Sequence, residues 1–215
     1  MAGYINIHTH YLPKDESVFL FNNRFGFDKN LFLDKYYSIG VHPWDASLDF
    51  SILELEQYIL NENCLAIGEC GLDKLNGPDQ IIQKAVFKAQ LQLASKYQKP
   101  IIIHCVKAFD ELIEICRTFS DIPKIIHGFN KSLQLAKQLI EAGFYLSLNE
   151  STLKKKNFDF SLLPLDKLFF ESDNNQLISI YEIYNQASKH FNVEIELLKE
   201  KINLNFTTIF LKNGR

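Results

Sequence analysis

Short apolar runs recur along the whole chain and alternate with longer segments in which apolar residues return every three or four positions. The short runs are typical of buried β-strands, and the longer segments are typical of helices that cover a sheet. Eight strands are predicted, at residues 4–8, 18–22, 36–41, 64–69, 100–104, 124–127, 144–148 and 168–171. This alternation of strand and helix predicts a parallel sheet with helices outside it.

Apolar stripes with a period of 3.6 residues mark the helices. In residues 78–98 the stripe consists of Ile82, Val86, Ala89 and Leu93. Similar stripes predict helices over 109–116, over 135–140 with Gly143 as the closing residue, and over 181–191 and 195–202. We interpret these stripes as core positions and not as parts of a cofactor site.

Eight strands with outer helices predict an α/β fold, a (β/α)8 TIM-like barrel that forms one domain over residues 1–215. Such barrels typically need about 250 residues, so this one is short. The missing length lies at the front, because few residues separate the first two strands and residues 23–35 are typical of a loop. We therefore expect the first two crossover helices to be absent and the barrel to be shortened or distorted near its N-terminus.

Composition narrows the class of protein. Hydrophobic residues make up 47% of the 215 residues, which is typical of a compact globular protein. No window reaches the roughly 18 apolar residues that span a bilayer, and no basic segment followed by an apolar one opens the chain, so a cytoplasmic location without a membrane partner is expected. Four cysteines without C-x-x-C spacing are expected as reduced thiols.

A net charge of −3 argues against a protein that binds nucleic acid through a broad basic surface. It does not exclude a nuclease, because bound metal ions supply positive charge where the phosphate sits.

The first candidate chemistry is the H-T-H sequence that ends the first strand. Successive side chains of a strand alternate faces, so His8 and His10 are expected to project to the same side. Neutral imidazole is the commonest ligand of divalent transition metals, so a metal is the first hypothesis.

Further potential ligands follow other predicted strands. The complete set is His8, His10, Glu69, His104, His127 and Asp173. In a barrel the carboxyl ends of the strands meet at one mouth, so we expect these side chains to lie close together. Six ligands exceed the needs of one catalytic metal, and a carboxylate at Glu69 can bridge two cations. Two metals promote hydrolysis of phosphoryl bonds, with Asp173 placed to orient or deprotonate the water and Glu69 as the second catalytic carboxylate.

Several motifs share one family's order from end to end. They are H-T-H at 8–10, G-V-H-P-W at 40–44, A-I-G-E-C-G-L-D at 66–73, P-I-I-I-H-C at 100–105, I-H-G-F at 126–129, E-S-D at 171–173 and N-F-T-T-I-F at 205–210. With these motifs the chain resembles the TatD family of metal-dependent deoxyribonucleases, within the amidohydrolase-type barrel superfamily. The G-E-x-G-L-D element is the most specific of them.

The resemblance implies a phosphodiesterase that acts on DNA with two divalent metal ions, Mg²⁺ or Mn²⁺, with Zn²⁺ as another option. It implies one metal held by His8, His10, Glu69 and Asp173, and a second held by Glu69, His104 and His127.

Four departures from the family pattern concern this chain. The early helical region is largely missing, Val106 replaces an arginine, Ser172 replaces a threonine, and the loop after Asp173 is reduced to residues 174–176. All but the serine affect substrate contacts and leave the metal ligands in place. Hydrolysis is therefore better supported than DNA as the substrate.

Other residues near the predicted mouth have two possible roles. His42 either contacts the scissile phosphate or holds its loop, and Trp44 either stacks on a base or caps the barrel rim. Lys107 and Lys131 follow the ligands of strands five and six and are candidate phosphate contacts, whereas Asp73 is expected to anchor a loop.

The leading hypothesis is a two-metal deoxyribonuclease that acts on single-stranded DNA. Two alternatives stay open: a metal-dependent hydrolase of a small phosphoester, ester or amide on the same barrel, and a binding protein whose barrel no longer catalyses.

Overall fold

The computed structural model of the chain describes residues 2–28 and 31–211. The chain divides into two compact units, unit 1 (Met1–Phe21 and His127–Arg215) and unit 2 (Asn22–Ile126), and each is described by itself. The expectation of one domain over the whole chain stays a prediction.

Parallel strands form the centre of unit 2. They are β3 (Tyr37–Gly40), β4 (Cys64–Asp73), β5 (Ile101–Val106) and β6 (Lys124–Ile126). Each strand pairs with the next one in the chain, and all three pairings are parallel. Every residue of β4 is buried, because the strand has neighbours on both edges and helices over one face. The prediction of an apolar strand followed by a helix is confirmed here.

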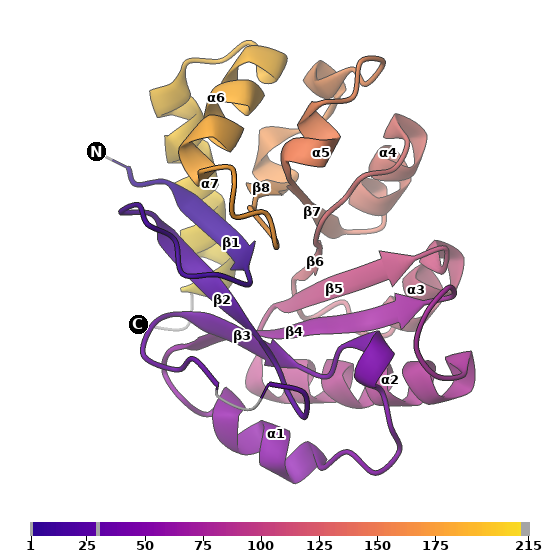
Figure 1. Ribbon diagram of the computed structural model, residues 1–215. Coiled ribbons are helices and arrows are strands. Elements are labelled where there is room, and N and C mark those ends of the chain that lie inside the picture. The colour runs from indigo at the N-terminus through magenta and orange to yellow at the C-terminus, as the bar shows by residue number, and fades with distance from the viewer. Residues whose placement is uncertain (1, 29–30, 212–215) are drawn as a thin grey trace. The chain divides into compact units, whose positions relative to one another are not determined.

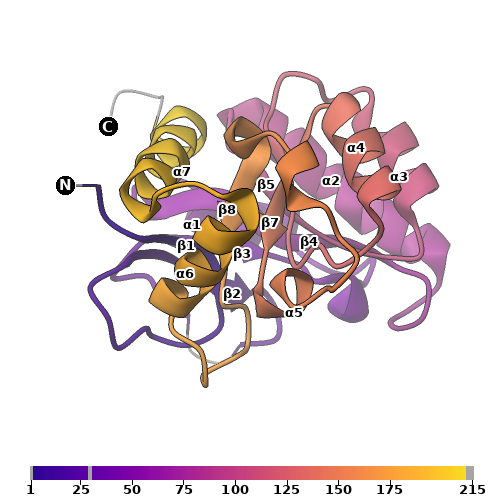
Figure 2. The same ribbon diagram turned by 90° about the horizontal axis from the view of Figure 1, so that it is seen from above.

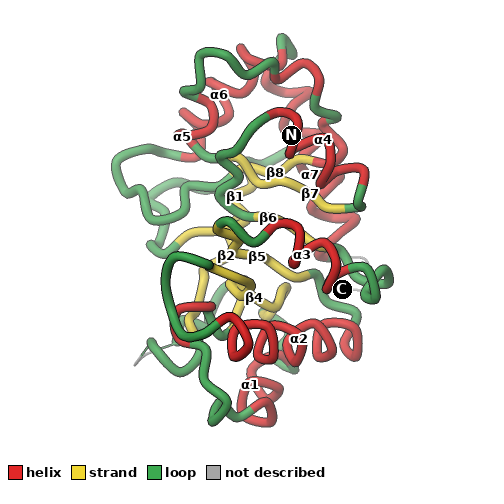
Figure 3. The backbone as a smooth tube through the Cα atoms, turned by 90° about the vertical axis from the view of Figure 1, so that its right-hand side faces the viewer, coloured by secondary structure: helices red, strands yellow, loops and turns green. Residues whose placement is uncertain are grey.

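The helices of unit 2 are α1 (Ile52–Ile59), α2 (Gln80–Tyr97) and α3 (Phe109–Cys116), with a short 3₁₀ helix, η1, at Pro43–Asp45. Helix α1 packs on β3 and β4, and α2 packs on β4 (Figure 1); Figure 3 shows α2 running beside β4. Helix α2 begins two residues after the predicted start, because the Asp79 carboxylate accepts a hydrogen bond from the Ile81 N–H and caps it. Helix α1 was not predicted: its buried apolar side chains are Leu55 and Ile59, too few to form a clear stripe.

Unit 1 is built on β1 (Ile5–Thr9), the start of β2 (Val18–Arg24), β7 (Phe144–Leu148) and β8 (Leu168–Phe170). Strand β1 pairs in parallel with β2, and β7 with β8. A bridge between Thr9 and Asp173 then joins β1 to the segment after β8. The last strand therefore returns to the first, which is the seam expected of a (β/α)8 barrel.

The helices of unit 1 are α4 (Leu133–Glu141), α5 (Glu150–Leu153), α6 (Ile180–Phe191) and α7 (Ile195–Phe210), with 3₁₀ turns η2 (Phe160–Leu162) and η3 (Leu165–Lys167). Helix α7 packs on β1 and β8, and α6 packs on α7 and β8 (Figure 2). The hydroxyl of the buried Tyr184 in α6 donates to the Ile5 carbonyl oxygen at 3.1 Å, which fixes this packing.

The front of the chain is short, as expected. Among the described residues between β1 and β3 (10–17, 25–28 and 31–36) no helix occurs. Within the described part of the chain, no helix is long and apolar enough to cross a membrane. The four cysteines, Cys64, Cys70, Cys105 and Cys116, are all buried.

Candidate metal centre

Glu69 lies in an irregular part of β4. The register between β4 and β5 shifts between Ile67 and Cys70, which is the mark of a bulge that redirects a side chain. Two glycines make this possible. At Gly68 (φ +144°) a Cβ would lie 2.5 Å from the Ile102 carbonyl oxygen, and at Gly71 (φ +144°) it would overlap the carbonyl oxygen of His104. The backbone can bring Glu69 close to β5 only with glycine at both ends of the G-E-C-G sequence.

Glu69 is the centre of a cluster in unit 2. Its Oε1 lies 2.8 Å from Nδ1 of His104 and 3.2 Å from Nε2 of His42, and the two imidazole rings are 4.6 Å apart between centroids. Asn22 clamps the same residue, because its Nδ2 donates to Glu69 Oε2 at 3.3 Å and its Oδ1 accepts from the Glu69 N–H at 2.9 Å. Glu69 is therefore held by side chain and backbone at once.

His42 supports Glu69 from the turn before η1. Its Nδ1 accepts a hydrogen bond from the Trp44 N–H at 3.2 Å, so in the neutral ring the proton sits on Nε2, facing Glu69. Burial lowers the pKa of His42 below its ordinary value, against the opposing effect of the Glu69 carboxylate. A neutral His42 fits the loop-holding role better than contact with a phosphate.

Asp73 closes the other side of this cluster. Its carboxylate accepts hydrogen bonds from Trp44 Nε1 at 2.6 Å and from the Leu75 N–H at 2.7 Å, and lies 3.4 Å from Nε2 of His104. Burial acts to raise the pKa of Asp73, but the hydrogen bonds from Trp44, Leu75 and Asn76 outweigh it and lower the pKa overall. Asp73 anchors its loop, as expected, and in addition orients His104.

A second cluster lies in unit 1. Nε2 of His10 is 3.5 Å and Nε2 of His8 is 3.8 Å from Asp173 Oδ1. Backbone hydrogen bonds set this geometry, since the Asp173 N–H donates to the His8 carbonyl oxygen at 3.0 Å and the His10 N–H donates to the Asp173 carbonyl oxygen at 3.1 Å. The two histidines do face one side, as the alternation of a strand requires.

His127 joins the second cluster and brings a residue that the sequence analysis missed. Its ring centroid is 4.4 Å from that of His8. Its Nδ1 lies 3.3 Å from Oε1 of the buried Glu171, which also accepts a hydrogen bond from the Gly128 N–H at 2.7 Å. From the sequence, Glu171 was named only as part of the E-S-D motif, without a role of its own.

Each cluster has the donor chemistry of a cation site. In unit 1 the candidate ligand atoms of His8, His10 and Asp173 all lie within 4.8 Å of one another, and in unit 2 the same holds for His42, Glu69 and His104. Imidazole nitrogen combined with carboxylate oxygen suits divalent cations from Mg²⁺ to Zn²⁺. Both sets of residues therefore fit a metal.

Lys107 and Lys131 do not belong to either cluster. Both are exposed. The backbone carbonyl oxygen of Lys131 accepts a hydrogen bond from Lys155 at 2.6 Å. Their contact with a phosphate stays a prediction.

Two hollows in unit 1 adjoin the cluster of His8, His10 and Asp173. The larger, of about 700 Å³, lies between the segment after β1 and the segment after β8 and is lined by His10, Phe21 and Leu177 among others. The smaller, of about 240 Å³, is lined by polar residues that include Asn149 and Asp173.

The sequence profile of the family described as "TatD related DNase" matches residues 28–211, most of the chain. The chain belongs to the TatD-related DNase family. The resemblance read from the motifs is therefore confirmed. His8 and His10 precede the matched stretch of this TatD-family chain.

Two curated relatives illustrate the family. The TATDN1 homolog of Enterocytozoon bieneusi (strain H348) is 34% identical over 149 residues. The match covers 63% of this chain and 54% of the relative, which is named as a deoxyribonuclease by inference. The uncharacterized metal-dependent hydrolase BU355 of Buchnera aphidicola is 26% identical over 202 residues, or 81% of this chain and 76% of the relative. The match spans about half the length of the first of them.

The fold class is confirmed by a solved structure. The crystal structure of YJJV, a TatD homolog from Escherichia coli k12, matches this TatD-family chain with a TM-score of 0.79 and 20% sequence identity. The match covers 97% of this chain and 98% of the YJJV chain. The chain thus has the α/β, TIM-like barrel fold predicted from its alternating strands and helices.

Proposed function

We propose that this TatD-family chain is a metal-dependent deoxyribonuclease that hydrolyses phosphodiester bonds of single-stranded DNA with two divalent cations, Mg²⁺ or Mn²⁺, with Zn²⁺ as another option. The observation that carries the proposal is the pair of donor clusters, His8 with His10 and Asp173 in unit 1 and Glu69 with His104 in unit 2, each of which combines imidazole with carboxylate. Family membership supports the substrate class.

The six predicted ligands are proposed to serve one centre. In a (β/α)8 barrel the carboxyl ends of the strands meet at one mouth. The first cation would be held by His8, His10, Glu69 and Asp173, and the second by Glu69, His104 and His127.

The chain's own residues have separable tasks in this reaction. Bound divalent cations polarise a phosphoryl oxygen and make a water more acidic. Glu69 is buried and hydrogen-bonded to Asn22 through both its side chain and its backbone N–H, so the position of its carboxylate is fixed. The Asp173 side chain is 27% exposed and carried on a backbone bridge, so water reaches its carboxylate, which is suited to orient and deprotonate the nucleophile.

The test is hydrolysis of end-labelled single-stranded DNA by protein stripped of metal and then supplied with Mg²⁺ or Mn²⁺. Cleavage that needs the cation and is lost in His104→Ala is expected. His190→Ala is the matched control, because His190 is an exposed residue of α6. Absence of cleavage by protein that binds cations in a calorimeter would refute the proposal.

A second candidate is hydrolysis of a small phosphoester, ester or amide. The hollow of about 700 Å³ beside His10 favours it, because pockets for small ligands fall in the range of roughly 300–1,000 Å³. This function predicts turnover of a small ester that excess DNA does not inhibit, and competition by DNA would exclude it.

A further inference from the structure

Two exposed aromatic rings, with the partly buried Arg24 near both, lie beside the Glu69 cluster in unit 2. The guanidinium carbon of Arg24 lies 4.0 Å from the ring centroid of Phe27 and 6.0 Å from that of Trp44. Both rings face solvent, since Phe27 is 59% and Trp44 47% exposed. We call Arg24, Phe27 and Trp44 the aromatic–arginine platform.

Each member of the platform is fixed in place. Nε and Nη2 of Arg24 both donate to Oδ2 of Asp45, at 3.0 and 2.5 Å, which holds the guanidinium plane. Trp44 is held by its indole N–H, which donates to Asp73. Rigid aromatic groups lose little entropy when a ligand stacks on them, so a fixed platform is suited to binding.

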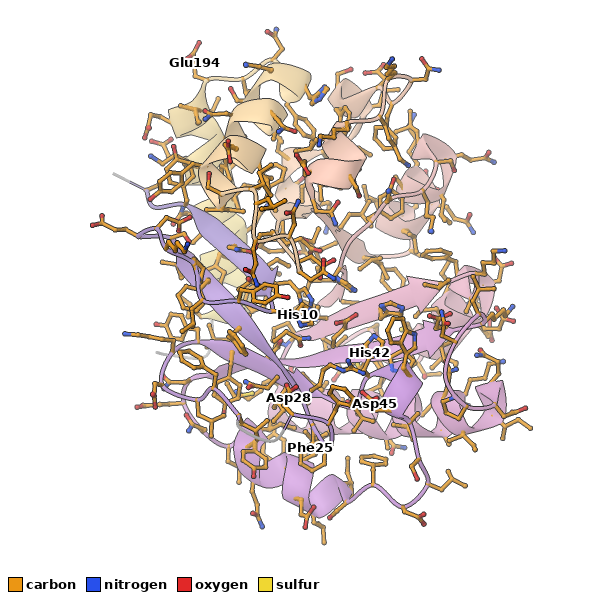
Figure 4. All side chains as sticks on the ribbon, in the orientation of Figure 1. His10, Phe25, Asp28, His42, Asp45 and Glu194 are labelled. Carbon is orange, nitrogen blue, oxygen red and sulfur yellow. The ribbon has the colours of Figure 1, made fainter. Side chains whose placement is uncertain are left out.

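Phe27 is presented by a tight turn after β2. The N–H groups of Phe27 and Asp28 donate to the Arg24 carbonyl oxygen at 3.1 and 2.9 Å, and the Asp28 carboxylate accepts from the Arg24 N–H at 2.6 Å. Phe25 packs against the core residues Val41, Ala46 and Val86 and anchors the turn. Figure 4 shows Phe25, Asp28 and Asp45 in the same part of unit 2 as His42.

The platform continues into the candidate metal ligands. The Trp44 ring centroid is 4.8 Å from that of His42 and 6.0 Å from that of His104. A planar group that stacks on the exposed rings would therefore lie next to the cluster where a phosphate is expected.

The chemistry of the platform selects bases over phosphates. Asp45 neutralises Arg24, so the guanidinium offers its flat face more than its charge. The chain carries a net charge of −3, so its overall charge does not attract a phosphate backbone. Aromatic and arginine planes that stack on unpaired bases are the usual device for holding single strands.

We propose that the aromatic–arginine platform stacks a nucleobase of single-stranded DNA beside the Glu69 cluster and so positions the strand for cleavage. The proposal rests on the deoxyribonuclease function proposed above. Base stacking on one ring corresponds to about 1–3 kcal/mol, or roughly a 5- to 150-fold change in the dissociation constant.

The first experiment uses the chain's single tryptophan as the probe. Trp44 fluorescence is titrated with oligothymidylate and with an abasic oligonucleotide of equal length, in EDTA and again in Ca²⁺. Quenching by the thymidylate that the abasic strand does not produce is expected in at least one condition. Equal responses to the two strands in both conditions, or no response to either, would overturn the proposal.

Variants then test the second ring. Phe27→Ala is expected to weaken thymidylate binding by about 5- to 150-fold and to leave the affinity for the abasic strand unchanged. Tyr36→Ala is the matched control, because Tyr36 is another aromatic side chain of unit 2, 38% exposed. Equal affinities of Phe27→Ala and Tyr36→Ala for thymidylate would overturn the proposal.

Failure of the platform and failure of the enzyme give different results. Metal-dependent cleavage without base-dependent binding would remove the platform and keep the proposed function. Base-dependent quenching without cleavage would keep the platform and remove the nuclease.

Discussion

The contact between Gly71 and His104 allows a sharp test of how β4 positions the site. Gly71 has φ +144°, a region that residues with a side chain rarely adopt, and its added Cβ would overlap the His104 carbonyl oxygen and lie 3.1 Å from the carbonyl carbon. Backbone strain of this kind costs about 1–3 kcal/mol, and overpacking against backbone costs about 1–3 kcal/mol more. We expect Gly71→Ala to lose about 2–6 kcal/mol of a total stability of about 5–15 kcal/mol.

Gly143→Ala separates the two contributions. Gly143 also has a positive φ, +89°, but nothing lies within 4 Å of an added Cβ. This variant therefore carries strain without a clash and is expected to lose about 1–2 kcal/mol. The larger loss expected for Gly71→Ala reflects mainly the collision with the backbone of β5.

Urea denaturation followed by circular dichroism measures both free energies of unfolding, and calorimetry measures the affinity for Mn²⁺. Because the clash falls on the backbone of His104, Gly71→Ala is expected to weaken cation binding, whereas Gly143→Ala is not. Equal losses of stability in the two variants, or unchanged cation affinity in a folded Gly71→Ala protein, would refute this account of the G-E-C-G sequence.

Three further predictions concern buried groups. Glu171→Gln keeps the shape of the side chain but removes the charge beside Nδ1 of His127, so we expect a 10- to 100-fold loss of Mn²⁺ affinity by calorimetry, and an unchanged affinity would contradict it. Phe87→Ala empties a buried position of α2 and is expected to cost about 3–5 kcal/mol in urea denaturation; a cost under about 1 kcal/mol would contradict the packing. Burial lowers the pKa of Lys124, so the unfolded chain binds this proton more tightly than the folded chain does. The free energy of unfolding of the wild type, relative to that of Lys124→Met, is therefore expected to rise as the pH increases from the lowered pKa towards about 10.4, the ordinary pKa of lysine. A fall over this pH range would contradict the prediction.

Most strands were predictable because a short apolar run bounded by polar residues is typical of a buried strand. The run at 144–148 predicted β7 with its observed bounds, and the run at 18–22 predicted the start of β2. The end of β4 was not predictable in the same way. After Glu69 the chain continues as strand to Asp73, because Gly71 pairs with His104 and Asp73 with Val106, and pairing across sequence is invisible in a local pattern.

The candidate ligands were likewise found by their position at strand ends, whereas their supports were not. Asn22 clamps Glu69 across 47 residues, and Glu171 reaches back 44 residues to His127. An asparagine in a strand and a glutamate two positions before an aspartate have no local feature that shows such a role. Only the fold brings these partners together.

The two central carboxylates differ in how they are held, and the difference supports different roles. Glu69 is buried and contacts the amide of Asn22 and the imidazoles of His42 and His104. The orientation of its carboxylate is therefore fixed without a bound cation. Asp173 is held mainly through its backbone, and its carboxylate stays open to water and lies 3.5 and 3.8 Å from two histidines. A fixed charge suits a ligand shared by two cations, and an accessible carboxylate suits proton transfer with water. The surroundings of the two carboxylates therefore support the proposed roles of Glu69 as the bridge and Asp173 as the base, independently of the order of motifs along the chain.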